Sequence, residues 1–291
     1  MRWNLHASYH KRTGVNTLFI HNISMYNAGN ITIQQGGPIY GTYRSLPAHA
    51  GGRGVLVPDD HRHQLDASSA YPMLEAYLDN GIDTIMGPMN PTNILYEAIQ
   101  YAQQKSGRKL IVVDTPIINV DDNEAARRET RAIIRRSHEY GATFCLIHHS
   151  SAEQLVNKNL HQITRLPDYL DMIRQEGLIP GLSAHMPELV LYSDEQGYDV
   201  ETYIQLYNAA GFLMQIEVET IASIIHNAKK PVMTIKPMAA GRLTPYVGLN
   251  FVWNTLRACD MVTVGCTTRD EAEEVIEISR AALDRRYPAI G

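Results

Sequence analysis

The sequence predicts an α/β protein folded as a (β/α)8 barrel, with an additional segment at its N-terminus. From about residue 80 onward, short apolar runs alternate with longer amphipathic runs, the pattern of repeated strand–helix units. The apolar runs are continuous, as expected for parallel strands that are buried on both faces. The chain has 291 residues, enough for a barrel, which typically needs about 250. A single barrel domain spanning residues 1–291, without a linker, is therefore expected.

Seven strand–helix units follow one another along the chain. Strands are predicted at residues 81–86, 109–114, 142–148, 179–183, 212–217, 231–236 and 261–265. Helices, with apolar residues at spacings of three and four, are predicted at residues 91–104, 124–140, 166–176, 200–210, 220–228, 249–258 and 270–283. One further strand is needed to close the barrel.

Two segments can supply the missing strand. Residues 54–58 are apolar and precede a predicted helix at 68–80, for which Ser68 or Ser69 is a suitable N-cap. Residues 1–53 would then be an N-terminal extension or hairpin packed on the barrel. Alternatively, residues 17–20 are the first strand and a long loop follows.

The composition of the chain indicates which kinds of binding partner and which cellular location to expect. The net charge is −5 and no basic block occurs, so a nucleic-acid partner is not expected. No apolar run reaches the length of about 18 residues that a membrane span requires, and the polar N-terminus lacks the apolar centre of a signal peptide. Three cysteines without paired spacing suggest reduced thiols in a cytoplasmic protein. A small-molecule substrate is expected, and a homo-oligomer is compatible with the sequence.

Polar residues end several predicted strands. In barrels of this kind the active residues lie at the C-terminal strand ends. The candidates are Asp114, His148, His149, His185, Gln215, Glu217 and Lys236, with Arg242 soon after. Because side chains alternate along a strand, only one of the adjacent histidines is expected to point inward. Asp59, Asp60, His61 and His63 also cluster, but their spacing matches no standard metal geometry and favours a solvated loop.

One hypothesis from these strand ends is a metal site. Asp114, one of the two adjacent histidines, His185 and Glu217 come from or follow four consecutive predicted strands. Two imidazoles and two carboxylates suit zinc, manganese or iron. The metal ligands would be His149, His185 and Glu217, with His148, Asp114 and Lys236 as catalytic groups. Lys236 and Arg242 could hold a carboxylate or phosphate. This set implies a lyase, isomerase or hydrolase acting on a small oxygenated substrate.

Several strand-end segments also resemble those of the aldo-keto reductases. The resemblance covers roughly residues 80–283 and is carried by Leu146-Ile147-His148-His149, Gly181-Leu182-Ser183, Gln215-Ile216-Glu217, Lys236-Pro237-Met238-Ala239-Ala240-Gly241 and Val264-Gly265-Cys266-Thr267-Thr268 with Glu273-Glu274. It implies a barrel that binds NAD(P) and reduces carbonyls. The cofactor would be held by Ser183, Gln215, Arg242, Gly265 and Thr267.

The chain departs from that family where its chemistry is concentrated. The family has a tyrosine as acid after strand two, but this chain has Met86-Gly87-Pro88-Met89-Asn90 there. The family has a lysine at the end of strand three, where this chain has Asp114; of the four catalytic residues only the histidine, as His148, is retained. Three interpretations therefore stay open: a repurposed, metal-assisted barrel enzyme, an NAD(P)-dependent reductase with another proton donor such as Tyr26, Tyr40 or Tyr43, and a catalytically inactive binding barrel.

Overall fold

The structure is a computed structural model that describes residues 18–21, 67–87, 89, 94–266 and 268–290. Eight strands close into a parallel barrel in the order β1-β10-β9-β8-β7-β4-β3-β2. They are β1 (Leu18–His21), β2 (Thr84–Met86), β3 (Ile111–Asp114), β4 (Phe144–Ile147), β7 (Ile179–Ala184), β8 (Thr202–Leu206), β9 (Val232–Ile235) and β10 (Met261–Val264). The predicted (β/α)8 fold is confirmed.

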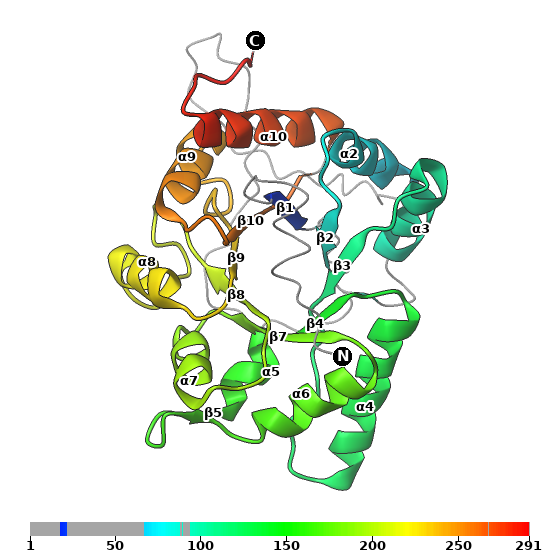
Figure 1. Ribbon diagram of the computed structural model, residues 1–291, viewed down its shortest axis with the longest axis vertical. Coiled ribbons are helices and arrows are strands. Elements are labelled where there is room, and N and C mark those ends of the chain that lie inside the picture. The colour runs from blue at the N-terminus through cyan, green and yellow to red at the C-terminus, as the bar shows by residue number, and fades with distance from the viewer. Residues whose placement is uncertain (1–17, 22–66, 88, 90–93, 267, 291) are drawn as a thin grey trace, which may run out of the picture.

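The helices form a ring outside the strands (Figure 1). They are α2 (Ala67–Asp79), α3 (Ile94–Ser106), α4 (Glu124–Glu139), α6 (Leu166–Gln175), α7 (Glu188–Gln196), α8 (Val218–Asn227), α9 (Pro245–Thr255) and α10 (Arg269–Asp284). Between β4 and α6 the chain adds the short helix α5 (His149–Ala152), the 3-10 turn η1 (Glu153–Leu155), and an antiparallel hairpin of β5 (Val156–Asn157) and β6 (Gln162–Ile163). None of the helices in the described ranges is both long and apolar enough to cross a membrane.

The strand that closes the barrel is Leu18–His21. It pairs in parallel with β10 on one side and β2 on the other. The alternative in which residues 17–20 supply the first strand is therefore the correct one, and a purely external extension over residues 1–53 is wrong for this segment. Residues 22–66, including the predicted strand at 54–58 and the Asp59, Asp60, His61 and His63 cluster, lie outside the described residues.

One stretch of the barrel differs from the sequence prediction. Residues 200–210, predicted to be a helix, contain strand β8, and residues 212–217, predicted to be a strand, form a loop. The Thr202–Leu206 segment is buried at every position, and its β-branched and aromatic residues suit a strand. The following chain turns because the Asn208 side chain accepts from Phe212 N at 2.9 Å and donates to Phe212 O at 3.1 Å. Leu213, with φ of 59°, is incompatible with an extended strand.

Alternation along the strands separates two apolar layers. One lines the barrel interior and contains Met86, Val113, Leu146, Ile204, Leu206, Met233, Ile235 and Met261. The other lies between strands and helices and includes the residues in between, such as Val112, Cys145 and Tyr203. Gly181 belongs to the interior row of β7. A Cβ atom there would lie 2.6 Å from Thr202 O and 2.7 Å from Leu146 Cγ, so only glycine fits without a shift.

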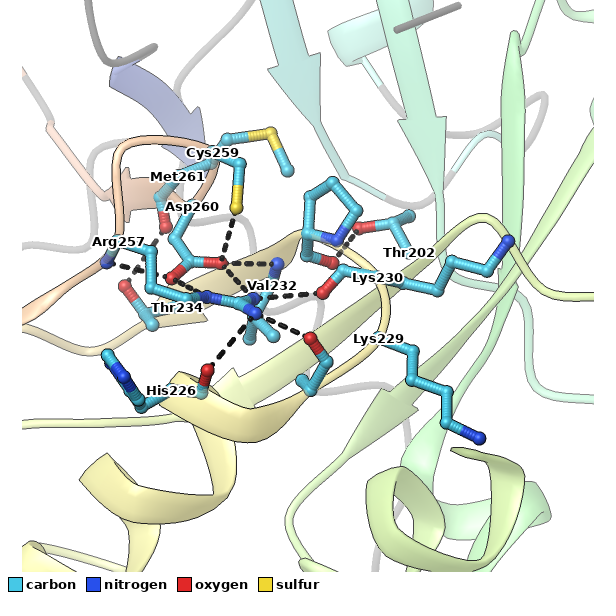
Figure 2. Close-up of polar contacts among 12 residues, drawn as sticks. Thr202, His226, Lys229, Lys230, Val232, Thr234, Arg257, Cys259, Asp260 and Met261 are labelled. Carbon is cyan, nitrogen blue, oxygen red and sulfur yellow. Dashed lines mark hydrogen bonds and ion pairs between the residues drawn. The ribbon is translucent and has the colours of Figure 1, made fainter. Parts of the chain in front are cut away.

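A buried ion pair holds the N-terminal ends of β9 and β10 together (Figure 2). The Arg257 guanidinium donates to Asp260 Oδ1 at 2.7 Å and Oδ2 at 2.9 Å, and to the carbonyl of Lys230 at 2.9 Å. Asp260 Oδ1 also accepts from Val232 N at 2.9 Å. The side chains are 19% and 0% exposed. This pair lies at the end of the barrel opposite the candidate site.

Candidate functional site

Among the residues that the structure describes, three histidines form a cluster at the C-terminal strand ends. His148 directly follows β4, His149 begins α5, and His185 directly follows β7. These two strands are neighbours, with Leu146 paired to Gly181. The ring centroids of His148 and His149 are 4.2 Å apart. Those of His149 and His185 are 3.7 Å apart, with an interplanar angle of 16°.

His148 is held by the start of α5. It follows the interior row of Phe144 and Leu146 by two residues, so strand alternation directs it toward the interior. Its Nδ1 accepts from the backbone N of Ser150 at 3.2 Å and lies 2.7 Å from Ser150 Oγ. Its own backbone N donates to Pro116 O at 3.0 Å, which ties this strand end to the loop after β3.

Glu153 connects His149 to the turn that carries His185. Its Oε1 accepts from the backbone N of His185 at 2.9 Å and of Met186 at 2.8 Å. Its other oxygen, Oε2, lies 3.9 Å from His149 Nδ1. One carboxylate one helical turn after His149 therefore faces two members of the cluster. No sequence motif indicated Glu153, because helix α5 was not predicted; with that helix in hand, the His149–Glu153 spacing of four residues is the signal.

Burial keeps two of the rings neutral. Desolvation is the main cause that lowers the pKa of His148 to about 4, with the charged form of His149 as a second cause. Desolvation likewise lowers the pKa of His185 to about 4, assisted by His149 and by the ammonium of Lys236. Both imidazoles are therefore uncharged at neutral pH and can serve as hydrogen-bond donors or acceptors.

Lys236 follows β9 at the same end of the barrel. It is partly buried, and its backbone is left-handed, with φ of 59°. A left-handed non-glycine residue costs energy, and such strain concentrates at functional sites. Within the described part of the chain, no carboxylate pairs with its ammonium. The loop continues with left-handed Ala239, Ala240 and Gly241.

Asp114 does not join the histidines. It alternates with Val113, which faces the interior, so the Asp114 side chain points into the helix layer. There Oδ2 accepts from Ser137 Oγ of α4 at 2.5 Å and Oδ1 accepts from Met89 N at 3.0 Å. Burial raises its pKa to about 6, against these hydrogen bonds. Its predicted membership of a convergent site with the histidines is wrong because of this direction.

Glu217 and Gln215 are also placed differently from the prediction. Both are exposed in the loop after β8, and Glu217 is the residue before α8 rather than a strand end. The glutamine that actually lies in strand six is Gln205, which is buried and has no hydrogen-bond partner for Oε1. Across the described ranges, no group of three or more His, Cys, Asp or Glu side chains is arranged to hold a metal ion.

The residues expected to hold a nicotinamide cofactor differ in their exposure to solvent. Ser183 is buried in the interior row of β7, whereas Gln215 and Gly265 are exposed. The guanidinium carbon of Arg242 lies 3.8 Å from the centroid of the Phe212 ring, and its Nη1 donates to Ala239 O at 3.2 Å. Thr267, Tyr26, Tyr40 and Tyr43 lie outside the described residues. A nicotinamide site at these positions stays a prediction.

Comparison with known proteins shows similarity of fold. No protein-family model matches the sequence, and no curated protein matches it significantly. Two structures of provisionally assigned aldo-keto reductases from Pseudomonas aeruginosa are similar at 17% identity. One has a TM-score of 0.56 and covers 80% of this chain and 87% of that chain. The other has a TM-score of 0.57 and covers 75% of this chain and 85% of that chain. At this identity the similarity concerns the barrel alone.

Proposed function

We propose that the protein is a barrel enzyme that transfers protons on a small, anionic, oxygenated substrate, as isomerases and lyases do. The observation that carries the proposal is the cluster of His148, His149 and His185 at the ends of adjacent strands. Imidazole is the side chain best suited to exchange protons near neutral pH. One carboxylate, that of Glu153, accepts from the backbone of His185 and lies beside His149, and so holds two of the rings in place.

The surroundings support the substrate class. His148 and His185 remain neutral at pH 7, as their low pKa values indicate, so either can polarise a carbonyl without adding charge. Lys236 brings a positive charge close enough to lower the pKa of His185. An ammonium without a carboxylate partner in the described residues suits a carboxylate or phosphate on the substrate. Ser183 in β7, two residues before His185, adds a buried hydroxyl to the same strand end.

Two other functions have weaker support. A metal-assisted reaction needs side chains that bind the metal ion, and the described residues include no group of three or more His, Cys, Asp or Glu side chains arranged to do so. An NAD(P)-dependent reductase is suggested by the fold of the Pseudomonas aeruginosa proteins, but Asp114, at the position of the family's lysine, points to α4. The experiment described below distinguishes both of these functions from the proposed one.

The test follows proton exchange, which does not require the product to be known. The protein is incubated in D2O with a panel of hydroxy acids, oxo acids and sugar phosphates, and proton NMR records loss of the C–H signals beside carbonyl groups. Exchange by the wild-type protein is expected, and His149→Gln should slow it by a factor on the order of 10² to 10⁴. His161→Gln is the control, because that ring stacks on Tyr192 outside the cluster.

The assay is repeated with a chelator, with added Zn²⁺ or Mn²⁺, and with NADPH. Exchange that is insensitive to all three supports the proposal. Exchange that a chelator abolishes and a metal restores would replace it by metal-assisted chemistry, and NADPH oxidation would replace it by reduction. No exchange with any member of the panel would overturn it.

A further inference from the structure

The ring nitrogens of His148 and His149 meet opposite kinds of partner. His148 Nδ1 faces donors, the backbone N–H of Ser150 at 3.2 Å and the Ser150 hydroxyl at 2.7 Å. His149 Nδ1 faces an acceptor, Glu153 Oε2, at 3.9 Å. A neutral imidazole has one N–H and one lone pair, and its neighbours decide which nitrogen carries the proton.

These partners impose opposite tautomers. A nitrogen that accepts a backbone N–H must have a free lone pair, so His148 carries its proton on Nε2. A lone pair on His149 Nδ1 would be repelled by the carboxylate oxygen, whereas an N–H there is attracted to it. His149 therefore carries its proton on Nδ1 and leaves Nε2 basic. The stacking of His149 on His185 engages the ring face and does not oppose this arrangement.

We propose that His148 and His149 are a donor–acceptor pair in which His148 Nε2–H polarises the substrate oxygen, His149 Nε2 takes the substrate proton, and Glu153 is the positioning residue that sets this division. The inference rests on the proton-transfer function proposed above.

The step balances within the cluster. The substrate C–H bond breaks, its electron pair forms the C=C bond of an enediolate, and the carbonyl oxygen gains the negative charge that the His148 N–H stabilises. The proton moves to His149 Nε2 and can return to the same carbon. It can instead return to the neighbouring carbon, provided that the hydroxyl proton on the first carbon's oxygen moves to the oxygen that carries the negative charge, which completes an isomerisation. The imidazolium formed on His149 faces Glu153. It also faces His148 and His185, whose pKa values its charge lowers, and with Lys236 acting on His185 neither neighbour competes for the proton.

Glu153 has a second task that a variant can separate from the first. Its Oε1 anchors the backbone of His185 and Met186. In Glu153→Gln the amide oxygen can still accept these bonds, while the amide NH2 replaces Oε2 opposite His149. This substitution should move the His149 proton from Nδ1 to Nε2 and leave the turn intact.

Long-range proton–nitrogen NMR spectra of ring-15N-histidine protein at neutral pH identify the tautomers. In the wild type, His149 should be protonated on Nδ1 and His148 on Nε2, and in Glu153→Gln only His149 should change. The matched control is Glu195→Gln, since Glu195 lies 3.5 Å from His161 Nδ1 and its loss should affect His161 alone. In the D2O assay, Glu153→Gln should lower exchange by a factor on the order of 10².

Protonation of His149 on Nε2 in the wild type, or an unchanged His149 in Glu153→Gln, would overturn the pairing even in an active enzyme. The spectra need no substrate, so they separate the two proposals. Correct tautomers without exchange on any substrate would count against the proposed function, not against the assigned ring states.

Discussion

Removal of Arg257 should destabilise the barrel more than any comparable change to a surface arginine. In Arg257→Ala, the buried carboxylate of Asp260 keeps backbone donors, including Val232 N, but loses its counter-charge. The carbonyls of Ala228 and Lys230 lose a charged donor as well. Breaking a buried pair by removing one partner costs about 3 to 5 kcal/mol, because the remaining charge stays buried.

Asp260→Asn separates charge from shape. The amide oxygen can still accept from Val232 N, while the amide NH2 faces the Arg257 guanidinium. The loss should be smaller, about 1.5 to 3 kcal/mol, because the guanidinium left without a counter-charge is partly exposed and keeps its bonds to the carbonyls of Ala228 and Lys230. A double variant, with both changes, should cost less than the sum of the two because the residues share their contacts.

The matched control is Arg174→Ala. Arg174 bonds both carboxylate oxygens of Asp199 at 3.0 Å and Glu201 at 2.7 Å. Its guanidinium therefore has at least as many bonds to carboxylate oxygens as that of Arg257, but its carboxylate partners are 69% and 38% exposed. Exposed pairs contribute about 1 kcal/mol or less.

Urea unfolding followed by circular dichroism measures these differences. With a slope of about 3 kcal/mol per molar urea, Arg257→Ala should lower the midpoint by roughly 1 to 1.7 M. A loss below about 1 kcal/mol for Arg257→Ala, or an equal loss for Arg174→Ala, would refute the assignment of Arg257 and Asp260 as a buried pair. The histidine tautomers should be unchanged in every variant, since the pair lies at the other end of the barrel.

Three further predictions concern pH and packing. The pKa values of His148 and His185 are lowered to about 4, so stability is present above about pH 6.5 and is lost as pH falls toward 4. Because the rings are partly exposed to solvent, this loss of unfolding free energy is limited to about 1 to 2 kcal/mol per ring. His185→Gln should therefore lose less stability than the wild type between about pH 6.5 and 4, as measured by urea unfolding at several pH values. The pKa of Asp114 is raised to about 6. Protonated Asp114 therefore stabilises the fold fully below about pH 3.8, and this stabilisation is lost as pH rises through 6. Above pH 6, Asp114→Asn should therefore be more stable than the wild type by up to about 3 kcal/mol. On acidification the wild type regains this free energy as Asp114 takes up its proton, whereas the variant does not, so the difference should shrink. A difference in unfolding free energy that does not change with pH would contradict this. Gly181→Ala should cost about 1 to 3 kcal/mol through overpacking, because its Cβ would contact Thr202 O and Leu146, and a neutral effect in thermal unfolding would contradict the tight contact.

The barrel was predictable because its evidence is repeated along the chain. Each strand is a short apolar run followed by an amphipathic helix, and an error in one unit does not change the count. The error at residues 200–217 shows the limit. Thr202–Leu206 and residues 212–217 are both apolar and of strand length, and local pattern alone does not rank them. The turn made by Asn208 with Phe212 and the left-handed Leu213 decide between them, and both depend on the folded chain.

The same reasoning explains why the candidate site was only half predicted. Listing polar residues at strand ends found His148, His149, His185 and Lys236. It also selected Asp114, because position along a strand tells where a residue lies but not which face it occupies until the interior row is known. Val113 lies in that row, so its successor must face α4.

Glu153 was missed for a different reason. It follows a helix of four residues, too short to produce an amphipathic pattern, yet that helix places it one turn beyond His149. The local chain thus determines the charge opposite His149 Nδ1, while the pairing of β4 with β7 brings the ring of His185 into stacking contact with that of His149. A site built in this way combines one contact that is near in sequence with one that only the closed barrel creates.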